Sequence, residues 1–181
     1  MDHAAAFLEN AAKEFRQLKT HADRALAQVD DPRFFHTLDA ESNSIAVICR
    51  HIAGNLISRW RHFLTEDGEK ADRHRDGEFE IPAGASRAEL VAAWEKGWST
   101  LFDELGKVRP EDVEKTITIR GEPHTVIAAI HRQLTHNAAH IGQVVYLAKH
   151  LAGTDWQTIS VPRGQSEEFN RKMRAQFEAS R

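Results

Sequence analysis

The sequence has almost no cysteine, and this limits how the protein can be stabilised. Among 181 residues there is one cysteine, Cys49. A single cysteine cannot form an internal disulfide, so we expect a protein of the reducing cytoplasm. Cys49 lies about 200° around a predicted helix from His51, two positions on. We therefore interpret Cys49 as a small core residue and not as a nucleophile.

Long apolar runs and an excess of basic residues are also missing. No apolar run approaches the roughly 20 residues that span a bilayer, and the first residues lack the basic and apolar regions of a signal peptide. Lys and Arg number 24 against 27 Asp and Glu, which gives a net charge of −3. A nucleic-acid binder usually carries a basic excess. The sequence thus predicts no membrane and no nucleic-acid partner.

Histidine, in contrast, is abundant in an otherwise ordinary globular composition. Hydrophobic residues make up 41% and charged residues 28% of the chain, which excludes global disorder and suits a single folded domain. There are eleven histidines but only one tyrosine and two methionines. Histidine titrates near neutrality and is a common metal ligand, so the question is which of the eleven have a function.

Apolar spacing of three and four residues predicts an all-α protein. Long helices are expected at about 2–29, 43–64, 87–105 and 125–151. Ser86 and Glu89 have capping-box spacing at the start of the third. A small hairpin within 116–126 and a short C-terminal helix at about 166–179 complete the pattern. We expect an antiparallel four-helix bundle over residues 1–152, with residues 153–181 as a C-terminal extension packed on the same domain.

One connection is unusually long for a compact domain. Residues 65–85 contain only two large apolar side chains, Phe79 and Ile81. Connections of this length are often functional or disordered. Two interpretations stay open: a solvated linker, or a loop that folds over one end of the bundle and supplies ionic contacts there.

Two histidines on the fourth predicted helix have the spacing of metal ligands. His136 and His140 are four residues apart, which places both on one helix face with Cβ atoms roughly 6 Å apart. Glutamate does not follow the first histidine, so a His-Glu-x-x-His metalloprotease is excluded. The pair flanks the apolar stripe and should lie at the edge of the core.

The second predicted helix offers a third ligand. Beside its apolar stripe runs a row of polar residues: Ser44, His51, Asn55, Ser58 and His62. His51 would be partly buried and needs a partner, either a hydrogen bond to Ser or Asn, or a metal shared with His136 and His140. Three imidazoles and one open position describe a catalytic metal site, which lowers the pKa of a bound water or thiol. Asn55, one turn from His51, is a candidate for supporting the ligands or contacting substrate.

These residues resemble the DinB-like superfamily of bacterial four-helix metalloproteins, marked by one histidine on the second helix and a His-x-x-x-His pair on the fourth. One uncharacterised subgroup is more similar still. The matching segments are Cys49 to Asn55 around His51, Asn55 to Phe63 with Ser58-Arg59-Trp60, Asp67-Gly68-Glu69-Lys70, His136 and His140 with Ile141-Gly142-Gln143, and Ser160-Val161-Pro162-Arg163-Gly164.

The resemblance implies a divalent metal, zinc or nickel, held by His51, His136 and His140, and a homodimer. The best understood relatives are thiol-dependent transferases, so it implies a metal-dependent S-transferase that activates a low-molecular-weight thiol. A metal-dependent hydrolase and a non-catalytic, metal-stabilised dimer are the alternatives. The helices show no Asp or Glu near His51 or His136 to serve as a general base. We therefore assign no catalytic residue, and metal identity, substrate and dimer surface stay open.

The resemblance also suggests how an anionic thiol would be held. Arg59, Arg73, Arg75 and Arg163 become candidates for contacting its carboxylates, with Arg59 and Arg163 expected at the site beside Asn55. The alternative is that these arginines form structural ion pairs with Asp67, Asp76 and Glu78.

Overall fold

The protein, described here by a computed structural model that covers residues 2–179, is predominantly helical with one small hairpin. The α-helices are α1 (His3–Leu26), α2 (Asp31–Phe35), α3 (Ile45–Trp60), α4 (Arg87–Leu105), α5 (Val126–Ala152) and α6 (Ser166–Glu178). Short 3-10 turns are η1 (Asp76–Phe79), η2 (Pro110–Asp112) and η3 (Gly153–Asp155). The four long helices, the hairpin and the C-terminal helix confirm the elements predicted from the sequence.

The helix starts follow from local capping. The Ser86 hydroxyl accepts the Glu89 N–H while the Glu89 carboxylate accepts the Ser86 N–H, which is the predicted capping box of α4. At the start of α3, the Ser44 hydroxyl accepts the N–H of Val47. The short helix α2 was not expected. Asp30 caps it and Pro32 lies in its first turn, where proline is well tolerated, so a new helix starts shortly after α1 ends at Leu26.

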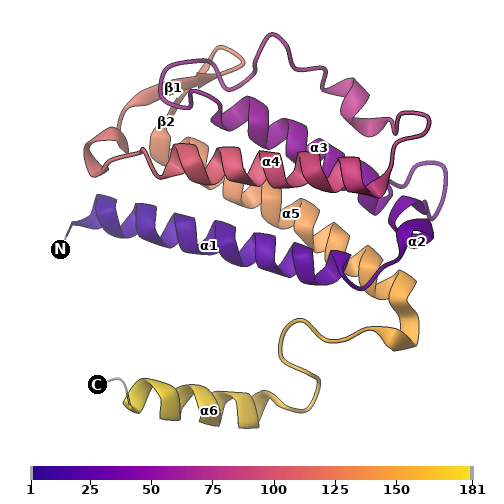
Figure 1. The fold of residues 1–181 in the computed structure, drawn as a ribbon. Helices are drawn as coiled ribbons and strands as arrows, with labels where there is room; N and C mark the ends of the chain where they lie inside the picture. Colours follow the sequence, from indigo (N-terminus) through magenta and orange to yellow (C-terminus); the bar gives the residue numbers. More distant parts are fainter. Residues whose placement is uncertain (1, 180–181) are drawn as a thin grey trace.

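The long helices pack in two adjacent pairs around a common apolar core. In Figure 1, α1 runs alongside α5, and α3 runs alongside α4. The largest fully buried side chains include Trp60, Trp94, Trp98 and Phe15. The α3 and α4 backbones approach closely at Gly97, where an added Cβ would lie 3.0 Å from Cα of Ala53. This close contact with α4 fixes the position of α3, the helix that carries the polar row with His51 and Asn55.

The hairpin precedes α5 and anchors the long connection. Strands β1 (Thr116–Ile119) and β2 (Glu122–Thr125) pair antiparallel. They are joined by Arg120 and Gly121, both with positive φ, as a tight type I′ turn requires. The carboxylate of Asp67 accepts the N–H groups of Arg120 and Gly121 at 2.8 Å each. Further contacts from α3 hold Gly68, Lys70 and Glu78. The long connection is therefore held against the folded domain from Asp67 to Glu78, and the solvated-linker interpretation is wrong.

The C-terminal extension contacts the helices through its first part. Arg24 of α1 donates to the carbonyl of Ile159 at 2.7 Å, and Gln28 donates to that of Gln157 at 3.0 Å. None of the described residues of α6 is buried, and α6 lies apart from α1 in Figure 1. Within residues 2–179, no helix has the length and apolarity needed to cross a membrane.

Candidate metal centre

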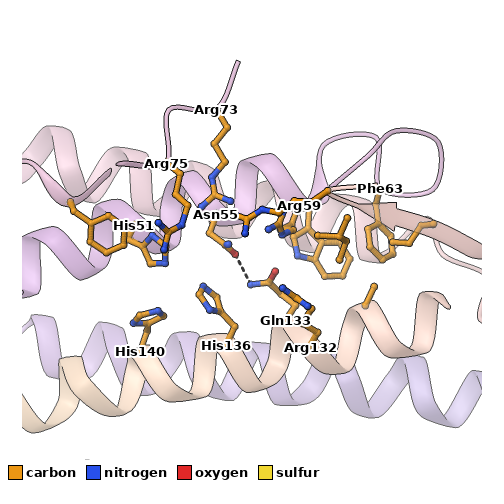
Figure 2. Close-up of a pocket in the computed structure, with 16 residues that line it drawn as sticks. His51, Asn55, Arg59, Phe63, Arg73, Arg75, Arg132, Gln133, His136 and His140 are labelled. Atoms are coloured by element: carbon orange, nitrogen blue, oxygen red, sulfur yellow. Dashed lines mark hydrogen bonds between the residues drawn. The ribbon is translucent and has the colours of Figure 1, made fainter. Parts of the chain in front are cut away.

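The three predicted ligands converge in the tertiary structure. His51 points from α3 toward α5, and His136 and His140 point back from α5 (Figure 2). One nitrogen from each ring lies within 4.8 Å of one nitrogen from each of the others. The ring centroids are 5.3 Å apart for His51 and His136, and 4.9 Å apart for His51 and His140. This grouping suits one shared ion with three imidazole ligands.

The chemistry of the donors fits a metal. Burial lowers the pKa of His136 to about 3 and also lowers the pKa of His140, so both rings are neutral and offer lone pairs. Nε2 of His136 is buried without a hydrogen-bond partner, which is costly unless something else satisfies it. Nδ1 of His140 lies 2.9 Å from Oε1 of Gln143. If Nδ1 carries the proton, Nε2 of His140 is free to bind a metal.

Glu78 completes the arrangement from the long connection. Its Oε2 lies 2.8 Å from Nδ1 of the buried His51, so that Nδ1 donates and Nε2 faces the other two histidines. Nε and Nη2 of Arg73 donate to the same carboxylate at 2.7 and 2.8 Å. Burial alone would raise the pKa of Glu78, but the bonds from Arg73 and His51 outweigh burial and lower it. A carboxylate behind a ligating histidine fixes the ring and its tautomer.

A glycine makes room for this carboxylate. A Cβ added to Gly54, in the middle of α3, would clash with Oε1 of Glu78 and lie 2.8 Å from its Cδ. Real Cβ atoms do not approach so closely. The Glu78 side chain cannot easily move away, because one hydrogen bond with His51 and two from Arg73 hold it. Gly54 therefore permits the long connection to lie directly against α3 beside His51.

The polar row of α3 now has an explanation, because three of its buried members, His51, Asn55 and Ser58, bind segments outside the helix. Asn55 Oδ1 accepts from Nε2 of Gln133 on α5 at 3.0 Å. The Ser58 hydroxyl donates to the carbonyl of Gly68 at 2.9 Å and accepts the N–H of Lys70 at 3.1 Å. His51 binds Glu78. The last member, His62, lies beyond the helix and is exposed.

The histidines line one end of a cavity of about 260 Å³ between α3, α5, the hairpin and the long connection. Phe63 lies at the end away from the histidines (Figure 2). Aromatic and aliphatic side chains and five arginines form much of the remaining wall. The cavity is of a size to hold a small molecule next to the three imidazoles.

The other predicted residues divide into two groups. Asn55 and Arg59 line the cavity, and Arg59 pairs with Glu69 at 2.9 Å. Arg163 is exposed on the segment after α5 and does not line the cavity, so the structure does not bring it to the three histidines. Cys49 is buried, and burial raises the pKa of its thiol to about 12, as expected for a core residue.

Sequence reasoning missed the acid at the site and part of the cavity wall. Glu78 comes from the long connection and not from the helices that carry the histidines, and the sequence indicated it only as an ion-pair partner of the arginines. In the sequence, Glu78 was otherwise marked only by its neighbour Phe79, an apolar residue in a polar stretch. In the structure, Phe79 stacks on His51 with ring centroids 4.7 Å apart. Gln133, Arg132 and Arg120 also line the cavity and had no distinguishing spacing.

Comparison with known proteins places the chain in a family. No curated protein matches the chain. Residues 2–165 match the family described as "Protein of unknown function (DUF1572)", and this range includes the three histidines, Glu78 and the whole cavity wall. The match covers most of the 181 residues. The chain therefore belongs to the DUF1572 family.

Proposed function

We propose that this protein is a metal-dependent S-transferase of the DinB-like type. Its four long helices would form a four-helix bundle that holds zinc or nickel on His51, His136 and His140, in a cytoplasmic homodimer. A low-molecular-weight thiol would be the activated substrate. The observation that carries the proposal is the convergence of three histidines within 4.8 Å at one end of a cavity.

In this proposal the histidines and Glu78 have different roles. Three imidazoles would hold the ion and leave a position for a small ligand, while Glu78 fixes the His51 ring. A divalent metal supplies Lewis acidity that lowers the pKa of a coordinated thiol. In the transfer, the thiol proton goes to solvent and the sulfur forms a bond to an electrophilic carbon. The bond to the leaving group breaks, and that group keeps the electron pair.

The lack of a free carboxylate among the residues that line the cavity favours this reaction over hydrolysis. A hydrolase would need a free general base near the ligands. None of the cavity-lining residues is Asp or Glu, and Glu78 behind His51 is bonded to Arg73 through both oxygens. In the proposed transfer the thiol loses its proton to solvent, so this reaction does not need a general base in the cavity wall.

Metal analysis is the first test. We expect the purified protein to contain about one equivalent of zinc or nickel, and His51→Ala and His140→Ala to lose it. His150→Ala, an exposed histidine on the same helix α5, is the matched control and should keep the metal. Retention of full metal by both site variants would exclude the proposed centre.

Activity is the second test. The metal-loaded protein is assayed with a panel of cellular thiols and a generic electrophile, beside His136→Ala. We expect the rate with at least one thiol to need the intact site. Ester or amide hydrolysis without thiol would indicate the hydrolase instead. If no thiol reacts and none shifts the melting temperature of the metal-bound protein, the protein is a non-catalytic, metal-stabilised one.

A further inference from the structure

The wall of the cavity is strongly basic. Among the residues that line it there is no Asp or Glu, but there are five arginines: Arg59, Arg73, Arg75, Arg120 and Arg132. The whole chain is slightly acidic, with a net charge of −3. Positive charge is therefore concentrated here against the overall balance.

Two of these arginines have largely buried side chains and form structural ion pairs. The side chains of Arg59 and Arg73 are only 10% and 4% exposed. Arg59 donates to the carbonyl of Gly68 and to Glu69, and Arg73 donates to Glu69 and Glu78. Both side chains are largely buried and paired with carboxylates of the protein itself, so they are poor candidates for binding a ligand.

The other three arginines are exposed, and their charges are only partly paired, or not paired at all, within the described residues. Arg75 is 48% exposed, and its one paired carboxylate, the fully exposed Asp76, lies 3.5 Å away. Arg120 is 52% exposed and shares Glu69 with the two buried arginines. Among residues 2–179, no acceptor or carboxylate pairs with the guanidinium of Arg132.

The charges at the cavity thus do not balance. Glu69 and Glu78 pair with three of the five guanidinium groups, those of Arg59, Arg73 and Arg120, and neither carboxylate lines the cavity. A partly enclosed site with one sign of charge concentrates ions of the opposite sign. Guanidinium groups bind carboxylates and phosphates through paired hydrogen bonds.

The available arginines approach the cavity from different sides. Arg75 descends from the long connection and stacks on Phe79 at 5.2 Å, next to His51. Arg132 rises from α5 beside Gln133, on the opposite wall (Figure 2). Arg120 is in the hairpin turn. One small anion could not pair with all of them, whereas a longer ligand with several anionic groups could.

We propose that this cavity binds a small molecule with two or more carboxylate or phosphate groups, held by Arg75, Arg120 and Arg132. The inference rests on the proposed function for one point, that the rest of the ligand lies toward the histidines as substrate. The anion-binding part of the proposal rests on the charges alone. Combined with the proposed function, it predicts that the substrate is a polyanion and not a neutral or cationic molecule.

The test is calorimetric titration of the metal-loaded protein at constant ionic strength. Succinate and tricarballylate represent carboxylates, glucose 1,6-bisphosphate represents phosphates, and neutral succinamide is the control ligand. Metal content is measured after each titration to show that no probe removes the ion. We expect at least one polyanion to bind and succinamide not to bind, and the better class identifies the anionic group.

Variants test the assignment of residues. Arg132→Gln and Arg75→Gln should each weaken binding of that polyanion about tenfold or more, the equivalent of about 1.4 kcal/mol. Arg171→Gln removes the same charge from exposed α6 and should change the affinity less than twofold. Arg132→Lys should recover part of the affinity.

Two results would overturn the proposal: no probe binds, or Arg171→Gln weakens binding as much as Arg132→Gln. Neither result bears on metal content or thiol transfer. Conversely, polyanion binding by a protein without transferase activity would leave this proposal standing and remove the proposed reaction. The two failures are therefore distinguishable.

Discussion

The substitution Gly54→Ala tests whether the long connection positions a metal ligand. The new methyl group would occupy the place of the Glu78 carboxylate, with its carbon 2.8 Å from Cδ. Glu78 would have to move away from α3. It would then lose its bonds of 2.8 Å to Nδ1 of His51 and of 2.7 and 2.8 Å to Arg73.

The size of the effect follows from opposing contributions. Alanine in a helix interior is favoured over glycine by up to about 1 kcal/mol. Breaking a buried, hydrogen-bonded ion pair costs about 3–5 kcal/mol, and the side chains of Arg73 and Glu78 are only 4% and 8% exposed. We expect a net loss of about 2–4 kcal/mol in the free energy of unfolding. Loss of the carboxylate behind His51 should also weaken metal binding by about 10–100-fold.

Denaturant unfolding and competition with a chromophoric chelator measure the two effects. Gly142→Ala is the matched control, because Gly142 is inside α5 and nothing lies within 4 Å of its added Cβ. It should raise stability by up to about 1 kcal/mol and leave metal affinity unchanged. Glu78→Gln keeps the shape of the side chain and should weaken metal binding without the steric clash. If Gly54→Ala gains stability like the control and binds metal normally, the role given to Glu78 is refuted.

Other substitutions probe features away from the ligands. Gly97→Ala should destabilise the protein by about 1–3 kcal/mol through overpacking, seen in denaturant unfolding, because its Cβ would lie 3.0 Å from Cα of Ala53; its metal content should not change. The bond from Lys115 is the main cause that lowers the pKa of Asp112 from 3.8 to about 2. This group stabilises the fold above pH 3.8, so the stability advantage of wild type over Asp112→Asn should shrink as pH falls from 4 to 2; an advantage independent of pH would contradict this. Cys49 is buried, so iodoacetamide should label it at an appreciable rate only in denaturant, and rapid labelling of native protein would place it elsewhere.

The helices and two of the ligands follow from local rules. Capping by Ser86 and Glu89 depends on residues three positions apart, and a shared face for His136 and His140 depends on a separation of four. Such contacts form within one helix, whatever surrounds it. His51 was recognisable because a row of buried polar residues interrupts the usual change from apolar stripe to charged flank.

The acid and the basic cavity wall depend on tertiary structure. Glu78 is 27 positions from His51. It reaches His51 only because Ser58 and the hairpin turn hold the long connection against α3, and because Gly54 leaves space there. Spacing rules do not describe a contact that depends on how an irregular segment folds.

The arginines show the same division. The family resemblance suggested that some of the arginines contact an anion, but the sequence could not tell which of them face the cavity. The structure places Arg132 in the cavity wall and Arg163 outside it. It also shows that Arg59 pairs with Glu69 and that Arg73 pairs with Glu78. The sequence by itself determined the helices and the shared face of His136 and His140, because these depend on local periodicity, and it named His51 as a candidate for the third ligand. Only the tertiary structure decided what supports the ligands and which charges stay free, because those depend on contacts between distant segments.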